Sequence, residues 1–134
     1  MRQVLYGKRF FKEEFGVDSR VLWLPDVFGY TGALPQIMRK CNVTQFFTTK
    51  MTWNETNKMP NDMFIWEGID GSQVFAAFEY AYSTEITPTY VYEYWKKFKN
   101  KSYNDETLLT FGFADGGGGP TYEMMETHRR MQYG

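Results

Sequence analysis

Apolar residues recur with helical spacing in four segments of the chain, which are residues 2–15, 31–41, 87–98 and 120–131. Gly16 and Asn42 follow the first two segments and suit the left-handed conformation that often ends a helix. Thr87 before Pro88 is typical of a helix start. The pattern therefore predicts four helices, whose expected apolar faces hold Val4, Phe11, Phe15, Leu34, Ile37, Met38, Cys41, Val91, Tyr94, Trp95, Phe98, Met124, Met125, His128 and Met131.

Short apolar runs between these segments predict buried strands at residues 21–24, 45–49, 63–67, 73–78 and 108–113. The third and fourth runs flank an Asp70–Gly71 turn and read as a β-hairpin. The order is helix, strand, helix, strand, hairpin, helix, strand, helix. Such alternation favours an α/β fold with a mostly parallel sheet. The strands are too few to close a barrel, which needs about eight.

Composition narrows the class of protein. The chain has 134 residues, 43% of them hydrophobic, which suits one modest domain or part of a larger one. Its net charge of −1 gives no basic surface for nucleic acid or an anionic membrane, and no apolar run is long enough to cross a membrane. The N-terminus lacks a secretory signal, and the lone Cys41 excludes an internal disulfide. We therefore expect a cytoplasmic, reducing location.

Two carboxylates occupy equivalent positions in this pattern. Asp26 follows the strand at residues 21–24, after Pro25, and Asp115 follows the strand at residues 108–113. If the strands are parallel, both carboxylates lie at one edge of the sheet, where paired carboxylates can cleave a glycoside. The four glycines after Asp115 would let a ligand approach the backbone closely. The plainer alternative is that Asp26 caps the next helix and Asp115 is an ordinary turn residue.

Several other side chains are candidates for a functional site. Lys50 and Trp53 follow the second strand and are expected at the same edge, where they could contact a substrate. Lys50 could also steady a carboxylate electrostatically. His128 lies on an apolar helix face without a second histidine, so we expect a packing role, and Cys41 reads as a buried thiol. The glycine run lacks the Gly-Lys-Ser/Thr ending of a phosphate-binding loop.

Several motifs resemble the catalytic domain of glycoside hydrolase family 38, the α-mannosidases. These are GKRFFKEEFG at residues 7–16, LPDVFGYTGALPQI at 24–37, TTKMTWN at 48–54, FIWEGIDGS at 64–72 and DGGGGPT at 115–121. They cover nearly the whole chain in the order of the family. The cytosolic and bacterial branch is more similar than the Golgi or lysosomal one.

The resemblance implies part of an irregular (β/α)7-type barrel and a retaining, metal-assisted hydrolysis of α-mannosidic bonds in oligosaccharides. By the resemblance, Asp26 would be the nucleophile and a ligand of a divalent metal, usually zinc. Asp115 would be the acid/base, and Lys50 would be the basic residue near the nucleophile. Ala114 stands where the family is expected to have glycine, which puts the turn at Asp115 in doubt.

The other metal ligands of the family, a His-x-Asp pair and a histidine of a later domain, are not found in the 134 residues. We therefore expect residues 1–134 to be a fragment of the catalytic domain, with the remaining domains of the parent enzyme as its partners and with little zinc binding or activity alone. The main alternative is a non-catalytic remnant or sugar-binding module. A related zinc-dependent deacetylase is disfavoured, because it needs His and Asp clusters.

Overall fold

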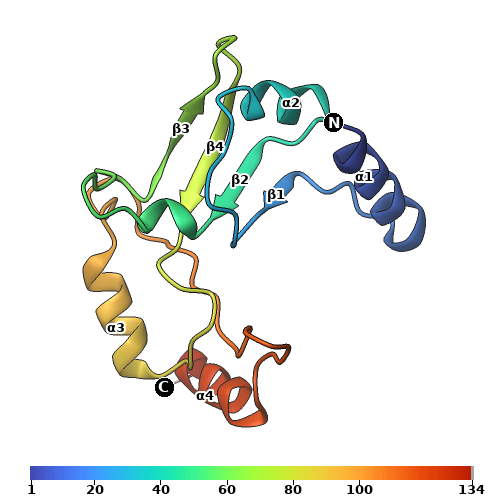
Figure 1. Ribbon diagram of the computed structural model, residues 1–134. Helices are drawn as coiled ribbons and strands as arrows, with labels where there is room; N and C mark the ends of the chain where they lie inside the picture. The colour runs from blue at the N-terminus through green and yellow to red at the C-terminus, as the bar shows by residue number, and fades with distance from the viewer. Residues whose placement is uncertain (134) are drawn as a thin grey trace. The chain divides into compact units, whose positions relative to one another are not determined.

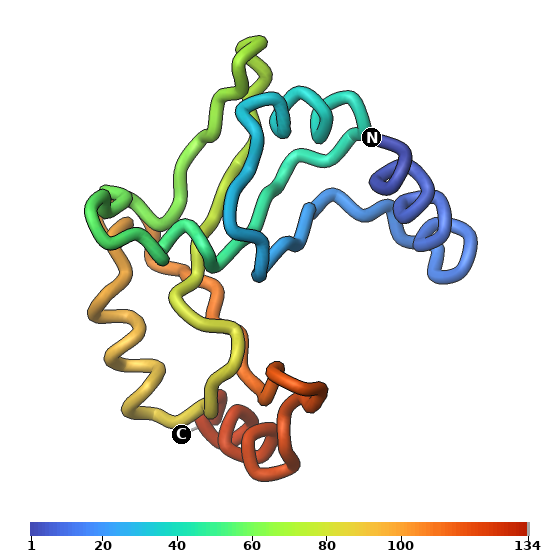
Figure 2. The backbone as a smooth tube through the Cα atoms, viewed as in Figure 1, coloured from blue at the N-terminus to red at the C-terminus, as the bar shows by residue number. Residues whose placement is uncertain are grey.

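A computed structural model describes residues 1–133, and their backbone divides into two compact units (Figures 1 and 2). We call residues 1–59 and 63–78 the sheet unit, and residues 60–62 with 79–133 the helical unit. The elements, in chain order, are α1 (Arg2–Phe15), β1 (Val21–Trp23), α2 (Leu34–Lys40), β2 (Gln45–Thr48), the 3-10 helix η1 (Lys50–Thr52), β3 (Met63–Glu67), β4 (Gln73–Phe78), α3 (Pro88–Lys97) and α4 (Tyr122–Tyr133).

The sheet unit is built on a sheet with strand order β1-β2-β4-β3. β1, β2 and β4 run parallel, and β3 pairs antiparallel with β4, to which the predicted hairpin turn connects it. Leu22, Phe46 and Ala76 are aligned across the three parallel strands. The predicted α/β class with a mostly parallel sheet is therefore confirmed. The four strands form an open sheet within residues 1–133, so the barrel stays a prediction.

One face of the sheet carries the core of the sheet unit. α2 packs over this face, and the fully buried cluster is Met38, Cys41, Val43, Phe46, Val74 and Ala76. Strand residues alternate between faces, so Phe46 and Ala76 point toward α2. The Cys41 thiol is free and buried, as predicted. Gly16 and Asn42 both adopt the left-handed conformation, with φ of 69° and 55°, which confirms the two helix ends.

The predicted burial of the first strand is wrong. Among residues 1–133, β1 pairs only with β2, at the edge of the sheet, and 45% of Val21 and 46% of Trp23 is exposed. The apolar run at residues 21–24 correctly predicted a strand, but the burial inferred from it was too high. Composition does not distinguish an edge strand from a central one. Trp23 keeps one packed face, since its ring stacks on Phe47 with 4.0 Å between centroids.

The predicted strand at residues 108–113 is also wrong. Within the described residues, this segment forms a single isolated bridge, between Thr84 and Gly112. The backbone N–H and hydroxyl of Thr110 both donate to the buried Glu79 carboxylate instead of to a neighbouring strand. The Glu79 side chain, distant in sequence, thus satisfies the backbone N–H of Thr110 that a strand ladder would have used.

The helical unit contains α3 and α4. Thr87 caps α3 as predicted, since its Oγ1 accepts from Tyr90 N at 3.1 Å. Tyr94 and Met124 are buried, whereas the predicted burial of Val91 is wrong, because it is exposed. Met125, on the expected apolar face of α4, is also exposed. His128 packs beside Phe111, with 5.6 Å between ring centroids, which agrees with the predicted packing role.

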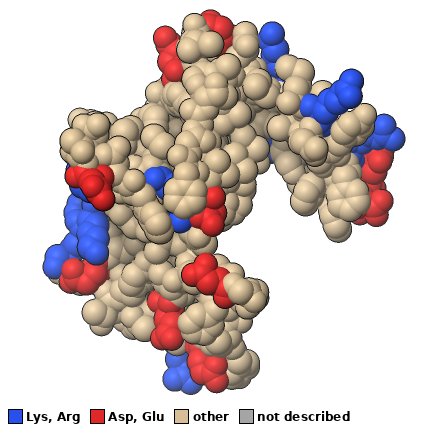
Figure 3. Space-filling view, viewed as in Figure 1, with Lys and Arg blue, Asp and Glu red and all other residues tan. Residues whose placement is uncertain are grey.

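Charged side chains on these helices pair locally, for example Lys96 with Glu93 at 3.0 Å. Figure 3 shows basic and acidic side chains interspersed over the face it draws, without one broad basic patch. No helix among residues 1–133 is both long enough and apolar enough to cross a membrane.

Candidate active site

Asp26 stands at the carboxyl edge of the parallel strands, as the sequence predicts. β1 pairs with β2, and the pairing continues one residue further through a 3.0 Å bond from Leu24 N to Phe47 O. Pro25 then interrupts the ladder, because proline has no N–H to donate. The chain turns at this point, and the Asp26 side chain is left 55% exposed. A carboxylate here is accessible to a ligand from solvent.

Lys50 follows β2 and meets Asp26 at the same edge. The Lys50 Nζ lies 2.7 Å from Asp26 Oδ1, and the lysine side chain is only 5% exposed. A nearby ammonium group favours the ionised form of a carboxylate. The structure therefore brings together an accessible carboxylate and a buried cation.

Two aromatic rings enclose the lysine. Its Nζ lies 3.6 Å from the Trp53 ring centroid and 5.1 Å from that of Phe28. The two rings meet edge to face, with 6.1 Å between centroids, and both remain largely exposed. Cation–π contacts offset part of the desolvation of the ammonium. The exposed ring faces beside Asp26 also offer apolar surface of the kind that sugar rings pack against.

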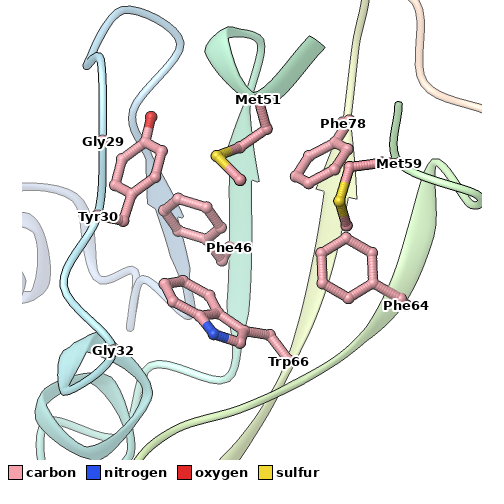
Figure 4. A pocket seen from close by; sticks show the side chains of 9 residues that line it. All are labelled: Gly29, Tyr30, Gly32, Phe46, Met51, Met59, Phe64, Trp66 and Phe78. Carbon is pink, nitrogen blue, oxygen red and sulfur yellow. The ribbon is translucent and has the colours of Figure 1, made fainter. Parts of the chain in front are cut away.

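An apolar pocket of about 480 Å³ lies behind this edge, on the α2 face of the sheet (Figure 4). In Figure 4 the Phe46 and Trp66 rings point into it, and their centroids lie 5.3 Å apart. Its lining residues are Gly29, Tyr30, Gly32, Phe46, Met51, Met59, Phe64, Trp66 and Phe78. A sugar ring needs convergent polar partners, and this lining is almost wholly apolar. The pocket is therefore not the candidate sugar site.

Asp115 lies in the helical unit, on an exposed glycine-rich turn. Ala114 N donates to Ser83 Oγ at 3.2 Å, and Phe113 N donates to Gly119 O at 3.0 Å. Gly116 and Gly117 adopt φ of 78° and 84°, a region that favours glycine. Residues 108–113 do not form the predicted strand directly before Asp115. The argument that placed Asp115 beside Asp26 at the end of parallel strands is therefore wrong. Its role as acid/base stays a prediction.

The donor set for a metal is incomplete within the described residues. No group of three or more His, Cys, Asp and Glu side chains among residues 1–133 is arranged to hold a metal ion. Asp26, the predicted ligand, has its Oδ1 against the Lys50 ammonium. A tetrahedral zinc site usually takes four ligands, so these residues do not fit a complete site.

Sequence reasoning missed two buried carboxylates, Asp62 and Glu79. Glu79 follows β4 directly, belongs to the helical unit and is 0% exposed. Burial raises the pKa of the Glu79 carboxyl, while hydrogen bonds from the Thr110 hydroxyl and N–H oppose the rise. Its place after a strand was a usable signal. The apolar run at residues 73–78, directly before Glu79, indicates a hairpin strand but does not by itself indicate a buried carboxylate after it.

The sequence is similar to that of one known protein family. The sequence model of the family described as "Glycosyl hydrolases family 38 N-terminal domain" matches residues 1–134. "Alpha-mannosidase G" of Dictyostelium discoideum is 43% identical over 128 residues, which are 94% of this chain and 12% of the relative. "Alpha-mannosidase 2C1" of Homo sapiens is 40% identical over 133 residues, which are 98% of this chain and 13% of the relative.

Among solved structures, an α-mannosidase from Enterococcus faecalis matches with a TM-score of 0.49 and 20% identity. The match covers 72% of this chain and 12% of that one. The chain thus spans about an eighth of the length of the relatives it matches, at 12% and 13% of theirs.

Proposed function

The chain belongs to glycosyl hydrolase family 38, and from this membership we propose that it supplies the nucleophile-bearing segment of an α-mannosidase catalytic domain. The observation that supports the proposal is the 2.7 Å ion pair between Asp26, which is accessible, and Lys50, which is buried. A nucleophilic carboxylate must be ionised and open to substrate. Asp26 meets both conditions at the edge of the sheet where α/β folds bind ligands.

The proposed reaction is retaining hydrolysis in two steps. An Asp26 oxygen bonds to the anomeric carbon of the mannose while the glycosidic C–O bond breaks, and the leaving oxygen takes a proton from Asp115. A water molecule then gives a proton to Asp115 and bonds to the anomeric carbon, which releases the Asp26 carboxylate. Two inversions leave the product with its original α configuration.

Lys50 and Trp53 have supporting roles in this proposal. The Lys50 ammonium keeps Asp26 ionised and limits its rotation through the 2.7 Å contact. Trp53 shields that ammonium from water and presents an exposed ring face to the sugar. Asp115 is assigned as the acid/base. This assignment is supported by the resemblance of the DGGGGPT motif alone.

No step of this reaction is assigned to a metal, because residues 1–133 lack a set of three donors. A zinc ion at Asp26, as the resemblance implies, needs its remaining ligands from other parts of a longer enzyme. The sheet is open, so a barrel, like the zinc site, needs further segments of a longer enzyme. We propose that the strands β1 to β4 form part of an irregular barrel that other segments of the parent enzyme complete.

The second candidate is a non-catalytic remnant or sugar-binding module. It is favoured by one observation, the incomplete donor set. Under this reading the Trp53 and Phe28 rings still offer a sugar-packing surface, but no bond is cleaved. We therefore propose that catalysis requires the longer enzyme, and that the 134-residue chain alone turns over no mannoside.

The test uses an activated aryl α-mannoside and a polypeptide as long as the matched relatives that contains this segment. Proton NMR identifies the anomer of mannose that is released first. We expect α-mannose, as retention requires. Release of β-mannose would contradict the assignment of Asp26 as nucleophile, and absence of hydrolysis by the long polypeptide would favour the remnant.

A further inference from the structure

The carboxyl ends of β1 and β2 are joined by two buried threonines. Thr49 N donates to Pro25 O at 3.3 Å, and Thr49 Oγ1 donates to the same carbonyl. Thr48 Oγ1 accepts from Lys50 N at 3.3 Å and also contacts the Tyr30 hydroxyl. Both threonines are almost fully buried. Each of them therefore lies beside a residue of the ion pair and is held rigidly.

The turn that bears Asp26 is bonded to its surroundings through the two carbonyls that precede it, Leu24 O and Pro25 O. Pro25 donates no backbone hydrogen bond, so Leu24 N is the last donor of β1 in the ladder and Pro25 takes part through its carbonyl alone. The Pro25 carbonyl links the Asp26 turn to the end of β2 by accepting from both the backbone N–H and the hydroxyl of Thr49. Tyr30 binds the preceding carbonyl, Leu24 O, at 3.0 Å.

We propose that Thr49 is a positioning residue, whose hydroxyl sets the place of the Asp26 carboxylate against the Lys50 ammonium. Thr49 is bonded to Lys50 through one peptide unit, while its hydroxyl holds the peptide that precedes Asp26. It therefore joins the two charged residues by a short, buried path that excludes water. The catalytic consequence rests on the function proposed above, whereas the geometric consequence for the ion pair does not.

Four variants test the proposal. Thr49→Val keeps the shape and the backbone bond to Pro25 but removes the hydroxyl, and Thr49→Ser restores it. Thr52→Val is the matched control, because Thr52 Oγ1 donates to Thr49 O at 2.7 Å without touching the Asp26 turn. Tyr30→Phe, which frees Leu24 O, is measured in parallel and is expected to act in the same direction.

The geometric readout is an NMR cross-peak between the Asp26 Hβ and Lys50 Hε protons of the 134-residue chain. We expect the cross-peak in the wild type, Thr49→Ser and Thr52→Val, and its weakening in Thr49→Val and Tyr30→Phe. If Thr49→Val does not fold, Thr49→Ala, which also removes the hydroxyl, decides the outcome. An unchanged cross-peak in the folded variants would overturn the proposal, whether or not the chain belongs to a working mannosidase.

The catalytic readout is steady-state kinetics of the long polypeptide on an aryl α-mannoside. Thr49→Val should lower kcat by about 100-fold with KM nearly unchanged, as expected for a reacting group displaced by about 1 Å. Thr49→Ser should recover most of the loss, and Thr52→Val should show none. An equal loss in Thr49→Val and Thr52→Val would assign the effect to general packing and overturn the proposal. An inactive wild type with the NMR result as expected would contradict the proposed function alone.

Discussion

The Lys50 ammonium lies 2.7 Å from the Asp26 carboxylate, although one side chain is 5% exposed and the other 55%. The cation is held in place by the protein, and the anion is presented to solvent. A surface ion pair between two mobile side chains would contribute little. Here the Trp53 and Phe28 rings fix one partner, so the pair orients the accessible carboxylate.

The Asp26→Ala variant of the long polypeptide should lose mannosidase activity by at least about 10³-fold, because the residue that forms the covalent bond is gone. The fold should persist, since the Asp26 side chain is more than half exposed. Asp18→Ala is the matched control, because Asp18 pairs with Lys8 in the same unit. Hydrolysis rates and thermal melts of both variants check this. Equal activity loss in the two variants would count against a special role for Asp26.

The Lys50→Met variant should separate activity from stability. Methionine fills the space of the buried side chain, and the remaining Asp26 carboxylate is solvated by water. The free energy of unfolding should therefore change by less than about 1 kcal/mol. The rate should fall by about 100-fold, because the fixed positive charge beside the nucleophile is lost. Urea unfolding and kcat are the measurements, with Lys50→Arg as the charge-retaining control. A large loss of stability with little loss of rate would contradict this account.

The helices and the hairpin were predictable because local patterns determine them. Gly16 and Asn42 end two helices in the left-handed conformation, and Thr87 begins a third by accepting a hydrogen bond from Tyr90 N. The Asp70–Gly71 turn defines the hairpin in the same way. In contrast, the segment at residues 108–113 has a strand-like composition but bonds to Glu79, which is 31 residues from Thr110. No local pattern encodes such a distant partner.

The candidate site was predictable to a similar extent. The meeting of Asp26, Lys50 and Trp53 follows from parallel strands ending at one edge, and the structure confirms it. The link through Thr49 could not be predicted, because it depends on the depth to which each strand end is buried. The position of Asp115 was argued from a strand that does not form, so that part of the site rests on the resemblance.

Glu79 should make stability depend on pH. Burial raises the pKa of its carboxyl above the ordinary value, so the folded chain binds a proton more readily than the unfolded chain. The corresponding stability is fully present below the unfolded pKa and is lost as the pH rises through the folded one. Glu79→Gln should therefore be more stable than the wild type at pH 8, and the difference should shrink toward pH 4. Urea unfolding across this range is the measurement. A difference between the two chains that is independent of pH would contradict the assignment.

The 134-residue chain alone should bind no stoichiometric zinc. A complete site needs about four ligands, and residues 1–133 present no group of three donors. Titration calorimetry with zinc, followed by metal analysis of the dialysed chain, should show weak binding that Asp26→Ala hardly changes. Tight binding of one zinc ion that depends on Asp26 would contradict this prediction. The long polypeptide serves as the comparison, because it adds the remaining candidate ligands.

The central claim is that Asp26 forms the covalent bond to mannose, and labelling of the nucleophile tests it most directly. A fluorinated mannosyl fluoride that reacts with the long polypeptide but is released slowly should leave a mannosyl ester on the enzyme. Mass spectrometry of the digested protein then identifies the modified carboxylate. The account predicts the label on Asp26, and its absence in Asp26→Ala. A label on Asp115 or any other carboxylate would contradict it.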